Sequence, residues 1–207
     1  MAHDKLLKKL NSLYLQGLSG VRVAEMLQIP YRQVYRLMET NGIERRTAQE
    51  TNRIRYLKQK PSFTIKKGIR KSDTSLLTAG VMLYWAEGAK YKNKNTIDFA
   101  NSNPEMISIF IKFLRDICGI QEKKLRIYLY CYANQDIRKL KAFWSKVTRV
   151  RLEQFTKPYV REDFREDKKG KMPWGLIHVR YFDKKLYIQF EEWYSGLLKE
   201  IIGGVAE

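Results

Sequence analysis

One stretch of the chain, residues 45–72, is too densely charged to form part of a hydrophobic core. It holds ten Lys and Arg residues and one Glu, so it carries half of the protein's net charge of +18. Like charges at this density repel one another unless an anion neutralises them. We therefore expect a small domain at 1–44, a basic linker at 45–72 and a larger domain at 73–207. The linker tolerates a helix over 47–59, and Pro61 and Gly68 interrupt it.

The charge also limits the partners and the compartment. A large excess of Lys and Arg favours a polyanion, either nucleic acid or an acidic membrane surface. The longest uncharged run, 74–86, is shorter than the roughly 20 residues that span a bilayer, and no basic amphipathic helix stands out. The first ten residues contain no apolar signal segment. We expect a cytoplasmic protein, nucleoid-associated if bacterial, in which Cys118 and Cys131 are reduced core residues.

The first forty residues have the pattern of three short helices. Apolar residues recur at helical spacing, Ser19 can cap the second helix, and Gly17 and Gly42 end the first and third. With Ala24 facing the turn and Val34 ten residues later, this arrangement resembles a helix-turn-helix of the resolvase and transposase type, although Gln28 stands where that family often has Gly. The alternative is a plain three-helix subdomain.

If the third helix reads DNA, the residues facing outward near its start should make the contacts. Arg suits guanine and Gln suits adenine in the major groove, and Tyr suits phosphate. These residues are Tyr31, Arg32, Gln33, Tyr35 and Arg36. For Tyr35 the alternative is packing against the first helix.

The second part alternates helices and strands. We expect a helix over 74–87, a hairpin within 90–100, a helix from Asn103 to Gly119, a strand at 125–131, a helix over 137–147, a hairpin of 155–160 with 176–182, and a last helix over 186–198. Phe190, Trp193 and Trp144 fall on core stripes. This order predicts an α+β fold with one mainly antiparallel sheet, helices on one face and the other face free for a ligand.

The helix over 74–87 ends in an unusual way. It is apolar on nearly every side, so it must be buried or pack against another chain. Glu87 then places a carboxylate at the end of the helix, where the helix dipole favours cations. Such a carboxylate calls for a partner, either a metal ion or a basic side chain.

The segment GVMLYWAEG at 80–88, the lysine-rich turn after it and FANSNPEMI together resemble the LAGLIDADG homing-endonuclease family and its single-motif bacterial relatives. The resemblance implies a saddle-shaped sheet, with Glu87 and Gly88 at the family's last two motif positions. Val81, Met82 and Trp85 depart from the family's usual residues. Only one motif is present, so a site with two acids would need a homodimer through the helix over 74–87.

In that family, paired acids bind divalent cations beside scissile phosphates, and a basic residue stabilises the developing charge. The resemblance therefore implies Mg²⁺ held at Glu87 and Gly88, and Lys157 or Lys171 as the basic residue, the alternative for each Lys being a solvated surface residue. Asn101 and Asn103 are expected to cap the next helix.

Other residues are expected to touch DNA phosphates or bases. In the basic linker these are Arg45, Arg46, Arg53, Arg55, Lys66, Lys67, Arg70 and Lys71; beyond it they are Lys90, Lys92, Lys94, Lys171 and Arg180. Tyr128, Tyr130 and Tyr132 share one strand face, which either contacts DNA or is buried. The sequence thus predicts a protein that binds double-stranded DNA, either a metal-dependent homing-endonuclease-like enzyme or a catalytically inactive transcription regulator of the same fold.

Overall fold

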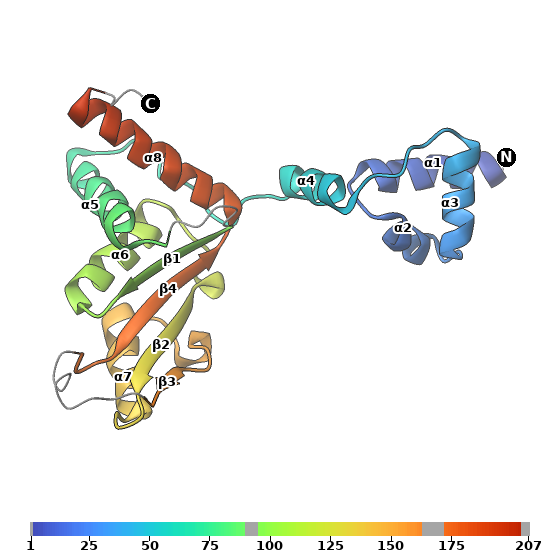
Figure 1. The fold of residues 1–207 in the computed structure, drawn as a ribbon. Helices are drawn as coiled ribbons and strands as arrows, with labels where there is room; N and C mark the ends of the chain where they lie inside the picture. Colours follow the sequence, from blue (N-terminus) through green and yellow to red (C-terminus); the bar gives the residue numbers. More distant parts are fainter. Residues whose placement is uncertain (1, 90–94, 163–171, 204–207) are drawn as a thin grey trace. The chain divides into compact units, whose positions relative to one another are not determined.

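The protein folds into two compact units, Met1–Lys60 and Pro61–Glu207. The computed structural model in Figure 1 describes residues 2–89, 95–162 and 172–203. Each unit has its own hydrophobic core. The basic segment expected as a linker is divided at this boundary, because residues 45–60 belong to the first unit and residues 61–72 to the second.

The N-terminal unit is entirely helical. It contains α1 (Ala2–Leu15), α2 (Gly20–Leu27), α3 (Tyr31–Thr40) and α4 (Ala48–Lys58). Leu10, Val23, Val34 and Met38 are fully buried between the first three helices. The three expected helices are therefore present, and α4 forms where the sequence tolerated a helix.

The turn between α2 and α3 is set by local interactions. Ser19 caps α2 by accepting a hydrogen bond from the Arg22 N–H, and Pro30 precedes the first turn of α3. Gln28 ends α2 in the left-handed region, with φ of 56°. This is the position at which the sequence departs from the glycine common in helix-turn-helix proteins.

The C-terminal unit is of the α+β class, as expected. Its elements are α5 (Lys71–Glu87), β1 (Thr96–Asn101), α6 (Pro104–Asp116), β2 (Arg126–Tyr132), α7 (Ile137–Thr148), β3 (Tyr159–Arg161), β4 (Leu176–Phe182) and α8 (Lys184–Ile202), with short 3₁₀ turns at Glu122–Lys124 and Leu152–Gln154. The strands form one sheet in the order β1-β4-β2-β3. β4 is antiparallel to both β1 and β2, and β3 is parallel to β2.

The expected hairpin of 155–160 with 176–182 is wrong. β4 lies between β1 and β2 instead, and β3 pairs with the other side of β2. Burial explains the difference: β4 buries Ile177, Val179 and Tyr181 completely, as a central strand does, whereas β3 is exposed throughout. The hairpin expected within 90–100 falls partly on 90–94, outside the described residues, and the backbone of Gly88 bridges to Phe99.

One face of the sheet is covered by helices (Figure 1). Side chains alternate along β2, so that Ile127 and Leu129 are buried on the helix side while Tyr128 and Tyr130 are only half-buried on the other. The helices contribute Phe110, Phe113, Trp144 and Phe190 to the core, with Trp193 packed beside them, as expected. The second face carries no helix among the described elements.

Helix α5 packs closely against α6. A Cβ on Gly80 would lie 2.1 Å from Cγ of Phe113, so only glycine allows this approach. Val81 and Tyr84 are buried on the same side of the helix, whereas Trp85 and Glu87 are exposed. The helix expected to be apolar all round is therefore buried on one side by its own chain.

The N-termini of α5 and α6 lie close to the positions expected from the sequence. The helix α5 begins at Lys71 and not at residue 74 as expected, because the Asp73 carboxylate accepts a hydrogen bond from the Arg70 N–H. Asn103 caps α6 through the N–H groups of Glu105 and Met106, and Asn101 accepts from the Asn103 N–H, so the capping role is confirmed.

Candidate nucleic-acid interface

The uncovered face of the sheet gathers basic and aromatic side chains from all four strands. We call it the open face. In register across the sheet, Asp98 lies opposite Arg180 and Arg180 opposite Arg126, His178 opposite Tyr128, and Tyr130 opposite Tyr159. Because alternate residues of a strand point to the same side, the open face includes Asp98, Arg126, Tyr128, Tyr130, Tyr159, His178 and Arg180.

Six of these seven side chains contact one another, whereas the Arg126 guanidinium donates to the backbone carbonyls of Lys123 and Leu125. The guanidinium carbon of Arg180 lies 4.2 Å from the centre of the Tyr128 ring. The rings of His178 and Tyr130 are 4.6 Å apart between centroids, and those of Tyr130 and Tyr159 are 5.1 Å apart. Contacts of a cation with an aromatic face are stabilising and keep the charged group near the surface.

The acid on the open face lies beneath its basic neighbours. Asp98 is only 7% exposed, with His178 Nδ1 2.8 Å from Oδ1 and Arg180 Nε 2.8 Å from Oδ2. Burial opposes the charged form of Arg180, but the Asp98 charge and a hydrogen bond to Tyr128 outweigh it and raise the pKa of the guanidinium. The group at the surface is thus a permanent cation.

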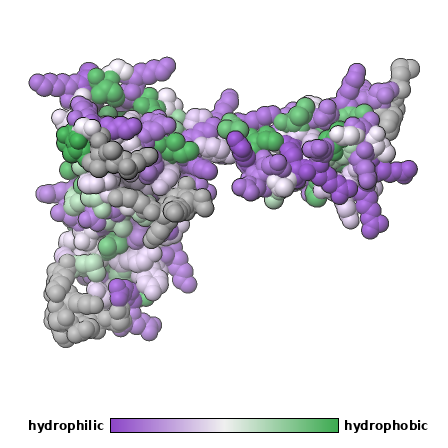
Figure 2. Space-filling view, turned by 45° about the horizontal axis from the view of Figure 1, so that its top comes forward, coloured by the Kyte–Doolittle hydropathy of each residue, from purple (hydrophilic) through white to green (hydrophobic). Residues whose placement is uncertain are grey.

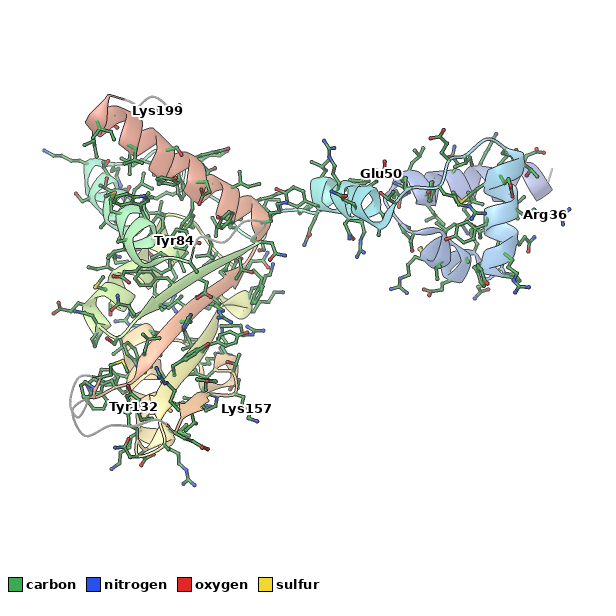
Figure 3. The ribbon with its side chains drawn as sticks, viewed as in Figure 1. Arg36, Glu50, Tyr84, Tyr132, Lys157 and Lys199 are labelled. Atoms are coloured by element: carbon green, nitrogen blue, oxygen red, sulfur yellow. The ribbon has the colours of Figure 1, made fainter. Side chains whose placement is uncertain are left out.

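Two further residues that the sequence singled out lie near this face. Lys157 is exposed just before β3 (Figure 3), and Tyr132 is buried, with the guanidinium carbon of Arg161 5.8 Å from its ring. The three tyrosines of β2 therefore differ in exposure: Tyr128 and Tyr130 are half-buried, and Tyr132, opposite Arg161 in register, is buried. Lys90, Lys92, Lys94 and Lys171 lie outside the described residues.

In the N-terminal unit, the exposed side of α3 carries the expected DNA-reading residues. Tyr31, Arg32, Gln33 and Arg36 are exposed, and Arg36 points away from α1 and α2 (Figure 3). Tyr35 is half-buried and lies over the start of α2, where a Cβ on Gly20 would be 2.9 Å from its ring. Tyr35 therefore packs against the start of α2 and on the core that the first three helices share.

A hollow of about 390 Å³ adjoins α3 in the same unit. Tyr35 separates it from the exposed side of α3, and the guanidinium carbon of Arg45 lies 4.5 Å from the Tyr35 ring. Arg55, Asn52 and Ser19 also line the hollow, and its described lining residues include no acid. The chemistry of these donors suits an anion.

Arg46, also expected to contact DNA, makes several contacts within the N-terminal unit. Its guanidinium donates to the backbone carbonyls of Tyr14 and Leu18 and stacks 3.8 Å from the centre of the Tyr14 ring. Its backbone N–H donates to the Tyr14 hydroxyl. These contacts fix the chain before α4 to α1, so Arg46 has a structural role here.

The other basic residues of the divided segment differ in exposure. Arg53, Arg55, Lys67, Arg70 and Lys71 are exposed. Lys66 is half-buried, with Nζ 2.8 Å from Oδ1 of Asp73. Hydrophilic residues, drawn in purple, cover most of the N-terminal unit's face in Figure 2.

Glu87 and Gly88, expected to hold a metal ion, form a simple helix end. Glu87 is the exposed last residue of α5. The Gly88 N–H donates to the Tyr84 carbonyl, and a Cβ on Gly88 would lie 2.3 Å from that oxygen, so a close backbone approach requires the glycine. Over the described part of the chain, no group of three His, Cys, Asp or Glu side chains could hold a metal ion. Among the described residues, Glu87 and Gly88 therefore have no further ligand beside them that would complete a magnesium site within one chain.

The sequence missed Asp98, His178, Arg126 and Tyr159 as members of this interface. Their signal was an acid inside an apolar strand and a His and an Arg two residues apart on another. Neither pattern shows that the two strands are neighbours. Only the sheet order brings Asp98 beside His178 and Arg180.

Comparisons with protein-family models, curated proteins and solved structures gave no match. Among the helices of the described ranges, none is both long and apolar enough to cross a membrane. The two free cysteines, Cys118 and Cys131, are buried, as expected.

Proposed function

We propose that the protein binds double-stranded DNA through the open face of the C-terminal sheet and through α3 of the N-terminal unit. One observation carries the proposal. The open face presents two arginines, a histidine and three tyrosines, and its one acid among the described residues is covered by Arg180 and His178. A surface that combines cations with flat rings suits a polyanion whose bases and sugars are also accessible.

The N-terminal unit supports the same proposal. The exposed residues of α3 combine an arginine fork with a glutamine amide, which are the side chains that pair with guanine and adenine in the major groove. The hollow lined by Arg45 and Arg55 lies beside them, at the start of α2. It is suited to a backbone phosphate, which would set the position of α3 on the duplex.

The test is the salt dependence of binding to a duplex. With about six or more phosphates neutralised, log K against log salt should have a slope of about −5. Replacing both Arg32 and Arg36 by Gln should make the slope less steep by about 2, whereas Arg138→Gln on α7 should leave it unchanged. A flat plot would contradict the proposal, and tighter binding to RNA or to acidic vesicles would replace DNA as the partner.

We also infer that the chain self-associates through α5. Ser75, Ala79, Met82 and Ala86 follow one another on the side of α5 away from Val81 and Tyr84, and Trp85 beside them is 39% exposed. Small residues at helical spacing allow two helices to approach closely. A symmetric pair of α5 helices would form an isologous homodimer.

Metal-dependent cleavage is a second candidate function, because such a dimer would bring two Glu87 carboxylates toward each other. No catalytic step is assigned, since the described residues of one chain offer too few ligands. Incubating a plasmid library with Mg²⁺ or with EDTA separates a nuclease from a catalytically inactive regulator. Cleavage that survives Glu87→Gln would remove Glu87 from any such site. Either protein would act where DNA is, in the cytoplasm or the nucleoid.

A further inference from the structure

The buried acid of the open face positions two side chains at once. Asp98 uses one carboxylate oxygen for His178 and the other for Arg180, each at 2.8 Å. Both partners come from β4, two residues apart and on the same side of the strand. A guanidinium held at Nε can no longer rotate freely, and an imidazole held at Nδ1 has a fixed orientation.

Asp98 thus orients both side chains through their inner nitrogens, and their outer nitrogens do not take part in these two contacts. The Asp98 contact uses Nε of Arg180, so Nη1 and Nη2 remain outside it. The Tyr128 ring packs against the guanidinium from a third side, with its centre 4.2 Å from the guanidinium carbon. Because an ionised Asp98 accepts from the Nδ1–H of His178, a neutral ring presents its Nε2 lone pair as an acceptor.

The same pairing reduces the local charge. Asp98 offsets the charge of Arg180, so this part of the face gains less from Coulomb attraction to phosphate than an unpaired cation would. Phosphate binding depends on net positive charge, whereas base recognition depends on oriented donors and acceptors. Because Asp98 lowers the net charge here and fixes the orientation of Arg180 and His178, these side chains are better suited to contact the edge of a base than a phosphate.

We propose that Arg180 and His178, positioned by Asp98, recognise a G·C base pair in the major groove. This inference rests on the proposed binding of duplex DNA. Guanine offers two acceptors, O6 and N7, to the Arg180 fork, and cytosine offers its N4–H₂ donor to His178 Nε2. Asp98 is a positioning residue, and Arg180 is the residue that reads the base.

The experiment selects duplexes from a random library with the wild-type chain and with Arg180→Lys. The Lys variant keeps the charge but loses the fork. The preference for guanine at one position should fall roughly tenfold or more, while the slope of log K against log salt stays the same. Asp98→Asn should weaken the same preference, and Arg138→Lys, on the helix side of the unit, should change nothing.

A modified base tests the contact directly, because its effect on binding would not depend on Arg180 if Arg180 had only a structural role. Replacing the selected guanine by 7-deazaguanine removes the N7 acceptor and should weaken wild-type binding by about as much as Arg180→Lys does. The two changes combined should cost no more than either alone, since they remove one interaction. Thermal unfolding identifies any variant that does not fold.

The outcomes separate this inference from the proposed function. If the wild-type chain binds no duplex, both are wrong. If it binds and Arg180→Lys keeps the guanine preference, only this inference is wrong. If Arg180→Gln weakens binding equally on all sequences and lowers the salt slope by about 1, Arg180 contacts a phosphate and the base-reading role is excluded.

Discussion

Gln28 has a backbone conformation that its side chain disfavours. Its φ of 56° lies in the left-handed region, where a Cβ crowds the following carbonyl at a cost of about 1–2 kcal/mol. Gln28→Gly should therefore raise the free energy of unfolding of the N-terminal unit by up to about 1 kcal/mol, after the extra entropy of glycine in the unfolded chain is subtracted. Thermal denaturation measures the change.

The matched control is Gln33→Gly at an exposed position of α3, where the φ is helical. Glycine there should lower stability by up to about 1 kcal/mol. A lower melting temperature for Gln28→Gly would show that the glutamine side chain makes a contact worth more than the strain.

Asp73 makes the stability of the C-terminal unit depend on acid pH. A hydrogen bond from Lys66, followed by one from the Arg70 N–H, lowers the pKa of Asp73 to about 2. The unfolded value is about 3.9. Since the folded pKa is the lower one, the stabilisation is present above about pH 4 and is lost as the pH falls through about 2.

We therefore expect Asp73→Asn to lower the melting temperature at pH 7 and to have little effect near pH 2. Asp116→Asn, which removes an exposed ion pair with Lys112 on α6, should change little at either pH. An Asp73→Asn effect that is equal at both pH values would mean that shape, and not charge, makes the contribution.

Single residues were predictable where a local rule applies. Ser19 and Asn103 are caps because a small polar side chain precedes each helix, and these roles follow from neighbours in the sequence. Arg46 was not predictable. Its partners, Tyr14 and Leu18, lie about thirty residues earlier, and nothing local distinguishes it from Arg45.

At the scale of elements, α5 has one side that its own chain buries and one side that it does not. Met82 is half-buried on the side of α5 opposite Val81 and Tyr84. Met82→Glu places a charge there and should convert a dimer to a monomer at tens of micromolar, with little change in melting temperature. Sedimentation velocity measures the state. Gly80→Ala, on the buried side, should instead destabilise the fold by about 1–3 kcal/mol, because its Cβ would meet the Phe113 ring.

A wild-type chain that sediments as a monomer, with and without DNA, would remove the proposed dimer. It would also remove the basis for a site with two Glu87 carboxylates. A Met82→Glu variant that unfolds gives a different result, because it would show that Met82 belongs to the core of one chain.

Helices were better predicted than strand pairing. The apolar stripes of α6, α7 and α8 are visible in the sequence, since their spacing depends only on the helix itself. The pairing of β4 with β1, far apart in the chain, depends on which strands share a buried face. The open face, with Asp98 beside Arg180, follows from that pairing and was therefore hidden.

At the scale of the whole molecule, the boundary between the units falls inside the most basic part of the chain. Both sides of it are anchored: Lys58 Nζ donates to the Leu15 carbonyl in one unit, and Ser62 donates to the Asp183 carboxylate in the other. The charge that suggested a linker therefore lies mostly on folded surfaces. The amino-acid composition therefore predicted that a domain boundary lies in this segment, but not that it falls between Lys60 and Pro61.

Only Gln59, Lys60 and Pro61 lie between the end of α4 and that first anchored residue, Ser62. If each unit holds DNA weakly, so short a tether makes the chain a bivalent ligand. Once one unit is bound, the other meets the same duplex at an effective concentration in the millimolar range. Where both can engage together, avidity can exceed either affinity by roughly 10²–10⁴ without any new contact. Flexible inserts of increasing length after Lys60 should lower this effective concentration, and with it the avidity, progressively.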